Sequence, residues 1–85
     1  MNIDKQVTVM KALADVTRLA IARKLSQVES LNCGELSETF DLSQPTLSHH
    51  FKRLIEADII IAKKEGTHMV YSLNKLLLHQ VGISL

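Results

Sequence analysis

Two adjacent histidines, His49 and His50, lie in the segment "DLSQPTLSHHFKRL", which spans residues 41–54. Imidazole groups could bind a metal ion, carry a proton or contact a nucleic acid. On a helix, two ligands to one zinc ion need i, i+4 spacing, whereas adjacent residues point about 100° apart. The pair is therefore not expected to form a metal site, and its role depends on the element that positions it.

The other reactive groups also lack the spacing of a catalytic or metal site. With a single cysteine, Cys33, the chain has neither an intrachain disulfide nor a Cys-rich zinc framework. It contains no Gly-rich phosphate loop, no nucleophile elbow and no paired carboxylates within an apolar segment. We therefore predict a protein that is not an enzyme, with no catalytic residue, no resident metal and no cofactor. A redox role for Cys33 and a metal site shared between two subunits stay open.

The histidines are expected on a helix that runs from about Gln44 to Ala57. Ser43 is a favoured N-cap, and Pro45 fits the first turn because its missing N–H needs no partner there. Projection at 100° per residue puts four apolar residues on one face, Leu47, Phe51, Leu54 and Ile55, with His50 at its edge. The opposite face carries Pro45, Thr46, His49, Lys52 and Arg53, with Gln44 and Ser48 at its margin.

Such a polar face suits the major groove of DNA. Gln can bond adenine through two hydrogen bonds, Ser and Thr can reach bases or phosphates, and Lys and Arg anchor the backbone. We predict that base edges are approached by Gln44, Thr46, Ser48 and His49. We predict that phosphates are contacted by Ser43, Lys52 and Arg53.

A β-hairpin is expected after this helix. Two short runs, "IIIAKK" and "HMVYSL", flank Gly66, which supplies the positive φ that a tight turn requires. A helix-turn-helix followed by such a hairpin predicts a winged helix-turn-helix, a mainly α fold with a small β-hairpin. The residues expected at the wing tip, over flanking phosphates or the minor groove, are Lys63, Lys64, Thr67 and His68.

Three helices are expected before the helix that runs from about Gln44 to Ala57, which we call the recognition helix, and one is expected after the hairpin. The first carries an apolar stripe of Ile3, Val7, Met10 and Ala14. The second follows an Asp15 cap and runs through Val28, with apolar residues on two sides. Asn32 and Glu35 have the spacing of a capping box at the start of the third. Asn74 can cap a last helix, "KLLLHQVGISL", that is markedly apolar.

Size and charge limit the organisation of the chain. Its 85 residues predict one domain, residues 1–85, with a core so small that a partner subunit would stabilise it. Residues 43–85 hold five bases against three acids, although the net charge is only +1. No apolar run approaches the ~20 residues of a membrane span, and no signal peptide is recognisable, so a cytoplasmic protein without a membrane partner is expected.

Three segments, "KALADVTRLAI", "CGELSETFDLSQPTLSHHFKRLIEADII" and "KKEGTHMVYSL", strongly resemble the ArsR/SmtB family of bacterial winged-helix repressors. The resemblance covers nearly the whole chain. It implies a homodimer that represses transcription by binding a double-stranded DNA operator with twofold symmetry. It also implies a dimer interface on the first and last helices, for which we predict Ile3, Val7, Met10, Leu76, Leu77 and Val81.

The chain departs from the family where many members bind metal. Asn32 and Gly34 stand at the positions of a Cys-x-Cys pair, and Lys75 and Leu77 match the first ligand pair of the last helix. Val16 replaces a common Pro, which should weaken the start of the second helix. Two alternatives stay open: a metal-responsive repressor with a non-standard site, and a winged-helix protein-interaction module that does not bind DNA, which the near-neutral charge favours.

Overall fold

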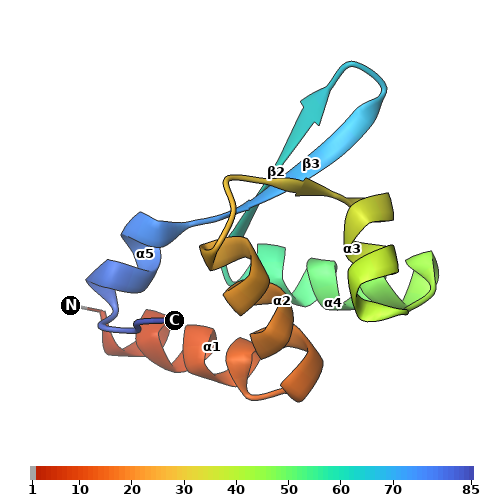
Figure 1. The fold of residues 1–85 in the computed structure, drawn as a ribbon. Helices are drawn as coiled ribbons and strands as arrows, with labels where there is room; N and C mark the ends of the chain where they lie inside the picture. The colour runs from red at the N-terminus through yellow and green to blue at the C-terminus, as the bar shows by residue number, and fades with distance from the viewer. Residues whose placement is uncertain (1) are drawn as a thin grey trace.

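The computed structural model describes residues 2–85, which form five helices and a three-stranded antiparallel sheet (Figure 1). The elements are α1 (Ile3–Leu13), α2 (Val16–Ser26), β1 (Leu31–Asn32), α3 (Cys33–Phe40), α4 (Gln44–Glu56), β2 (Ile60–Glu65), β3 (His68–Leu73) and α5 (Lys75–Gln80). The predicted mainly α fold with a β-hairpin is therefore confirmed. No helix within residues 2–85 is both long enough and apolar enough to cross a membrane.

Local hydrogen bonds set the helix starts, as the sequence predicted. Asp15, Asn32, Ser43 and Asn74 each accept from the backbone N–H three residues later. At α3 the Glu35 side chain also accepts from the backbone N–H of Asn32, which completes the capping box. Each cap satisfies a backbone donor that has no partner inside its helix.

Two helix ends and one strand differ from the expectations. Helix α2 ends at Ser26, so Val28 lies beyond the helix and not within it as predicted. Helix α5 ends at Gln80, earlier than predicted, and Gly82 just after it has a φ of 76°. Chain reversal at this glycine ends the helix despite the apolar residues that follow. Strand β1 was not predicted, because two residues carry too little periodicity to reveal a strand.

The core lies beneath α4, around α2. Ile21, Ala22 and Leu25 of α2 are fully buried, and so are Leu47 and Leu54 of α4. These residues share one cluster with Val9 and Leu13 of α1. The apolar arc predicted for α4 is correct except for Ile55, which keeps 38% of its surface exposed because it lies at the arc's outer edge.

The sheet connects the wing to the helices. Strand β3 lies between β1 and β2, and the hairpin projects beyond the helical body (Figure 1). Glu65 pairs with His68 across a two-residue loop, Gly66 and Thr67, in which Gly66 has the predicted positive φ of 61°. Tyr71 of β3 packs on Phe51 of α4, with ring centroids 4.4 Å apart.

Helices α1 and α5 lie side by side at the end of the molecule opposite the α3–α4 turn (Figure 1). The Gln6 amide donates to the carbonyl of Val81 at 2.9 Å and connects them. Val81 was predicted at the dimer interface. It is only 3% exposed and belongs to the core, so almost none of its surface is left to contact a second subunit. Gln80 ends α5, and the chain then turns the Val81 side chain inward.

Candidate nucleic-acid interface

A short turn holds α3 against the start of α4. Asp41 ends α3 in the left-handed region, with a φ of 52°, and Ser43 already caps α4. The Ser37 hydroxyl of α3 donates to the carbonyl of Leu42 within the turn. The first residues of α4 are thereby presented at the surface on a helix-turn-helix.

Every polar residue predicted to contact DNA from this segment is exposed. These residues are Ser43, Gln44, Thr46, Ser48, His49, Lys52 and Arg53. The hydroxyl of Ser43, however, both accepts from the Thr46 backbone N–H and donates to the Thr46 hydroxyl, the latter at 2.9 Å. Ser43 therefore positions the helix start, and its hydroxyl has less capacity left for a phosphate.

One margin of α4 faces the wing. Ser48 and Lys52 line a groove of about 290 Å³ together with Tyr71 of β3. At the start of the helix, Gln44 lines a second groove, of about 450 Å³, with Thr67 and His68 of the wing tip. Residues predicted separately on the recognition helix and on the wing are thus brought together.

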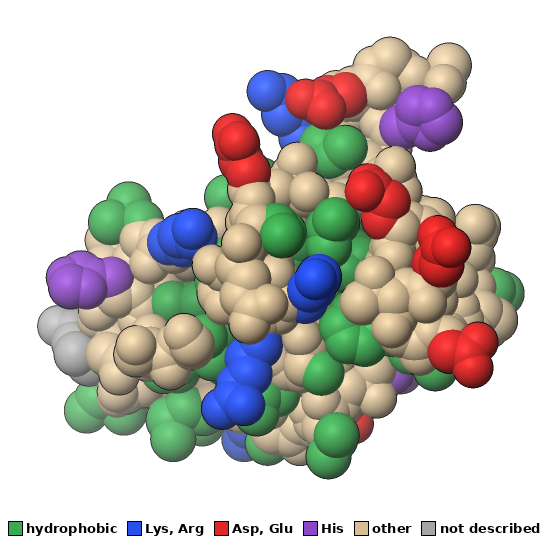
Figure 2. Space-filling model, in the orientation of Figure 1, with side chains coloured by type: hydrophobic (Ala, Val, Ile, Leu, Met, Phe, Trp, Pro, Cys, Tyr) green, Lys and Arg blue, Asp and Glu red, His purple; other side chains and the backbone are tan. Residues whose placement is uncertain are grey.

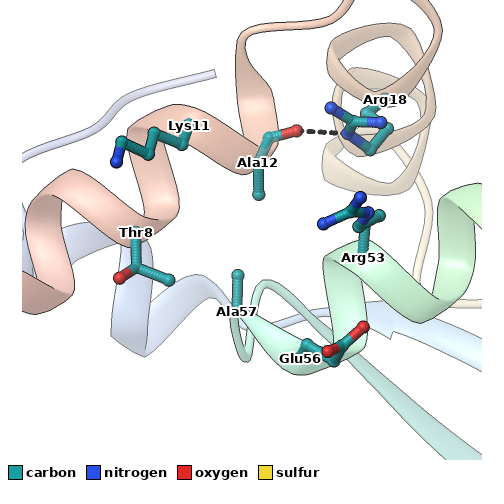
Figure 3. A pocket seen from close by; sticks show the side chains of 7 residues that line it. All are labelled: Thr8, Lys11, Ala12, Arg18, Arg53, Glu56 and Ala57. Atoms are coloured by element: carbon teal, nitrogen blue, oxygen red, sulfur yellow. Dashed lines mark hydrogen bonds between the residues drawn. The ribbon is translucent and has the colours of Figure 1, made fainter.

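The other margin of α4 faces away from the wing. Arg53 lines a pocket between α1, α2 and α4; Arg18 lies at the same end of this pocket and Lys11 at the other end (Figure 3). Lys52 and Arg53 are neighbours in sequence but lie on opposite margins, because adjacent helical residues diverge by about 100°. Lys52 and Arg53 therefore line different grooves of the surface.

The wing lysines are separated in the same way. In the β2–β3 register Lys64 pairs with Met69, and Lys63 pairs with Val70. Successive strand residues point to opposite faces, and cross-strand partners share a face. Lys64 therefore lies on the same face of the hairpin as Tyr71, the face that packs on α4, whereas Lys63 lies on the outer face.

Acidic residues gather on another side of the molecule. Glu35 and Glu38 of α3 and the neighbouring Asp41 are all exposed. Figure 2 shows red side chains over the α3 end of the face turned to the viewer. Negative charge there disfavours contact with a DNA backbone.

His50 and Asp15 meet where α4 packs on the start of α2. His50 is 14% exposed, and its Nδ1 has no hydrogen-bond partner within residues 2–85, with the nearest Asp15 oxygen at 3.9 Å. The pKa of Asp15 is lowered chiefly by the hydrogen bond from the Arg18 backbone N–H, with the Arg18 and His50 charges adding to it. His49 is exposed, so the two histidines have different surroundings, as the helical projection predicted.

Cys33 is half-buried in the first turn of α3 and lines the groove at the wing tip. Burial raises the pKa of the nearby Tyr71 hydroxyl, and the proximity of Cys33 raises it further. No group of three or more His, Cys, Asp or Glu side chains among residues 2–85 could hold a metal ion. Asn32, at one of the family's cysteine positions, is engaged in the capping box instead.

Sequence reasoning missed two features of this surface. The contribution of Lys11 and Arg18 was not predicted, because their distance from Arg53 along the chain hides their proximity. The contact between Phe51 and Tyr71 was also missed. Side chains alternate along β3, so Tyr71 lies on the same face of that strand as the buried Leu73. That alternation could have indicated an inward-facing ring.

The α3–α4 pair and the antiparallel hairpin together define a winged helix-turn-helix protein. The model of a family described as "Bacterial regulatory protein, arsR family" matches residues 15–62, from the cap of α2 into β2. The chain therefore belongs to the arsR family of bacterial regulatory proteins, as its sequence motifs indicated. This membership assigns it to transcription regulation and not to the enzymes.

Relatives and solved structures agree with this assignment. The arsenical resistance operon repressors of Staphylococcus aureus and Staphylococcus xylosus are 40% and 43% identical over 74 and 67 residues. These matches cover 87% and 79% of this chain, but 70% and 64% of the relatives' lengths.

Two solved structures share the fold. HlyU from Vibrio cholerae N16961 superposes with a TM-score of 0.83 at 32% identity, covering 95% of this chain and 88% of its own. The solution structure of a homodimeric winged helix-turn-helix DNA-binding domain from Mycobacterium bovis gives 0.82 at 23% identity, with 94% and 74% covered.

Proposed function

We propose that the chain is a single-domain, homodimeric, sequence-specific DNA-binding protein that represses transcription by occupying a twofold-symmetric operator. The observation that carries this proposal is the exposed, polar N-terminal half of α4 beside the wing tip. A helix N-terminus of this kind can enter the major groove while its backbone N–H groups and nearby cations meet phosphate. Repression is supported by the two staphylococcal relatives, which are named as operon repressors.

In this proposal the contacts have different roles. Gln44, Thr46, Ser48 and His49 approach base edges, because their short or flexible polar groups lie on the first turns of the helix. Lys52 and Lys64 anchor a phosphate strand that runs between α4 and the wing. Thr67 and His68, at the wing tip, reach the flanking phosphates or the minor groove of the DNA. Ser43 and Lys63 contribute less, the first because its hydroxyl is engaged and the second because of its strand face.

The homodimer is supported by apolar surface on neighbouring helices. Ile3 and Met10 of α1 are 70% and 55% exposed, and Leu76 of α5 is 67% exposed. Val7 lies between the two α1 residues and is also exposed, while Leu77 of α5 is half-buried. Burying this stripe against a second copy would remove it from water. A twofold dimer then spaces two recognition helices about 34–36 Å apart, one per successive major groove.

Selection of bound fragments from the source genome, followed by mobility shift at low salt, tests the proposal. The expected result is retention of a fragment that contains an inverted repeat, with affinity that falls steeply as salt is raised. No shift at any protein concentration would overturn DNA binding and favour the protein-interaction module. Zinc is titrated into the same complex: tight zinc binding that releases DNA would establish the metal-responsive alternative.

A further inference from the structure

A pocket of about 400 Å³ separates α1, α2 and α4 on the side of the recognition helix that faces away from the wing (Figure 3). Its charged lining residues are Lys11 of α1, Arg18 of α2, and Arg53 and Glu56 of α4. Three cations and one acid therefore line the pocket, in a chain whose net charge is only +1. The floor contains Ala12 and Ala57, whose small side chains leave the pocket open.

The arginine of α2 is held in place by a hydrogen bond. Arg18 donates from Nε to the carbonyl of Ala12 at 2.6 Å, which ties α2 to the end of α1. Its terminal Nη groups make no hydrogen bond to another described residue, so they stay available at the pocket. Asp15 lies close enough to Arg18 for the charges to interact, yet its carboxylate accepts from the Arg18 backbone and does not line the pocket.

Among residues 2–85 the two other cations, Lys11 and Arg53, have no ion-pair partner. Within residues 2–85 no ion pair or hydrogen bond engages the side chain of Lys11 or Arg53, and Glu56 is not within ion-pair distance of either. Figure 3 shows Arg18 and Arg53 reaching the same end of the pocket from different helices. Two guanidinium groups brought together in this way repel each other, and an anion between them would offset that repulsion.

We propose that Arg18 and Arg53 bind a phosphate-type anion in this pocket, and that the exposed Lys11 side chain turns toward the anion from the opposite side. Guanidinium groups match phosphate oxygens through paired N–H donors, and a flexible ammonium can complete the neutralisation. The phosphate can come from the DNA backbone beside the recognition helix or from a free phosphorylated molecule. With a DNA phosphate the inference rests on the function proposed above, and with a free anion it stands without it.

An anion bound here would connect two parts of the molecule. Lys11 belongs to the helix that carries the apolar stripe, and Arg53 belongs to the recognition helix. A phosphate bridging them fixes the orientation of α4 relative to α1. The same pocket is therefore suited either to extend the DNA footprint past α4 or to adjust the spacing of the recognition helices.

The test uses the full chain and follows backbone and Arg Nε–Hε signals by NMR. Inorganic phosphate is titrated first, at constant pH and ionic strength with chloride as the reference salt, and a short DNA duplex second. Lys11→Gln should weaken phosphate binding about fivefold, since one nearby charge is lost. Glu56→Gln should strengthen it by a similar factor. Lys75→Gln, an exposed lysine of α5 outside the pocket, is the matched control and should change nothing.

Each outcome separates this inference from the function proposed above. Saturable phosphate shifts at Arg18 and Arg53 support a free anion, whether or not the duplex binds. Shifts there with the duplex alone, together with a salt slope reduced by about 0.9 in Lys11→Gln, support a DNA phosphate. A duplex that perturbs the start of α4 but not the pocket, with no effect of phosphate, overturns the anion site and leaves DNA binding intact.

Discussion

Phe51 of α4 and Tyr71 of β3 stack with ring centroids 4.4 Å apart and ring planes inclined by 31°. Phe51 is 3% exposed, so this contact continues the core outward to the base of the wing. Tyr71 belongs to the central strand, and it pairs with Leu31 of β1 and Ala62 of β2. The ring thereby joins Ile60 and Leu73, which are buried at the base of the hairpin, in positioning the wing relative to α4.

Replacing this ring should loosen the wing. Tyr71→Ala is expected to lower the free energy of unfolding by about 2 kcal/mol, because the contacts of a half-buried ring and an aromatic pair are lost. Tyr71→Phe keeps the ring and should cost less than about 0.5 kcal/mol. Urea denaturation followed by circular dichroism measures both. Equal destabilisation by the two variants would assign the effect to the hydroxyl and contradict the stacking argument.

Gln44 should determine base preference. On the best selected site, Gln44→Ala is expected to lose about 1–3 kcal/mol of binding free energy and to tolerate a base change at its contact position. The salt slope should not change, since no charge is removed. Gln27→Ala, an exposed glutamine that belongs to neither α4 nor the wing, is the control. Unaltered affinity and selectivity in a gel-shift titration of Gln44→Ala would show that the recognition face is misassigned.

The strand register predicts that the two wing lysines differ. Lys64→Ala should weaken binding to all duplexes alike and reduce the salt slope by about 0.9, because one phosphate contact is lost. Lys63→Ala removes the same charge from the outer face and should change the slope by much less. Fluorescence anisotropy at several salt concentrations compares them. Identical slopes for the two variants would mean that the wing tip, and not one of its faces, meets the phosphates.

The apolar stripe on α1 should control assembly. Met10→Lys is expected to produce monomers at micromolar concentration, because a charge cannot be buried without a partner in the interface. Because the Met10 side chain is exposed, the variant should stay folded, and circular dichroism verifies this. Val16→Lys, a change at an even more exposed apolar residue outside the stripe, serves as the comparison. Sedimentation equilibrium that finds Met10→Lys dimeric would exclude this stripe as the interface.

Asp15 should make stability depend on pH in the acid range. Hydrogen bonding to the Arg18 N–H lowers its pKa below the ordinary value of 3.8, so the ionised form stabilises the folded chain. That contribution is complete above about pH 4 to 5 and is lost as the pH falls through the folded-state pKa. Asp15→Asn keeps a good N-cap but does not titrate.

Urea midpoints of the wild type and Asp15→Asn at several pH values test this dependence. The advantage of the wild type should shrink between about pH 5 and pH 3. A difference that stays constant over this range would contradict the assignment. Asp15→Ala removes the cap itself and should cost about 1 kcal/mol at neutral pH.

The sequence by itself determined the helix starts, the exposed face of α4 and the family. Caps such as Asn32 act over three residues, and helical periodicity separates His49 from His50 before any distant contact forms. The motif "LSQPTLSHHFKRL" indicates the family from local sequence alone, because it combines a cap, a first-turn proline and an apolar stripe in one continuous segment.

Only the tertiary structure decided how these elements combine into a surface. The polar face of α4 is divided because the wing covers one margin and α1 and α2 approach the other, and neither fact is encoded within residues 44–56. Arg53 lines one pocket with Lys11 and Arg18, and Val81 turns into the core, because segments far apart in the chain pack together. Such contacts depend on the packing of whole elements, which local propensity and periodicity do not specify.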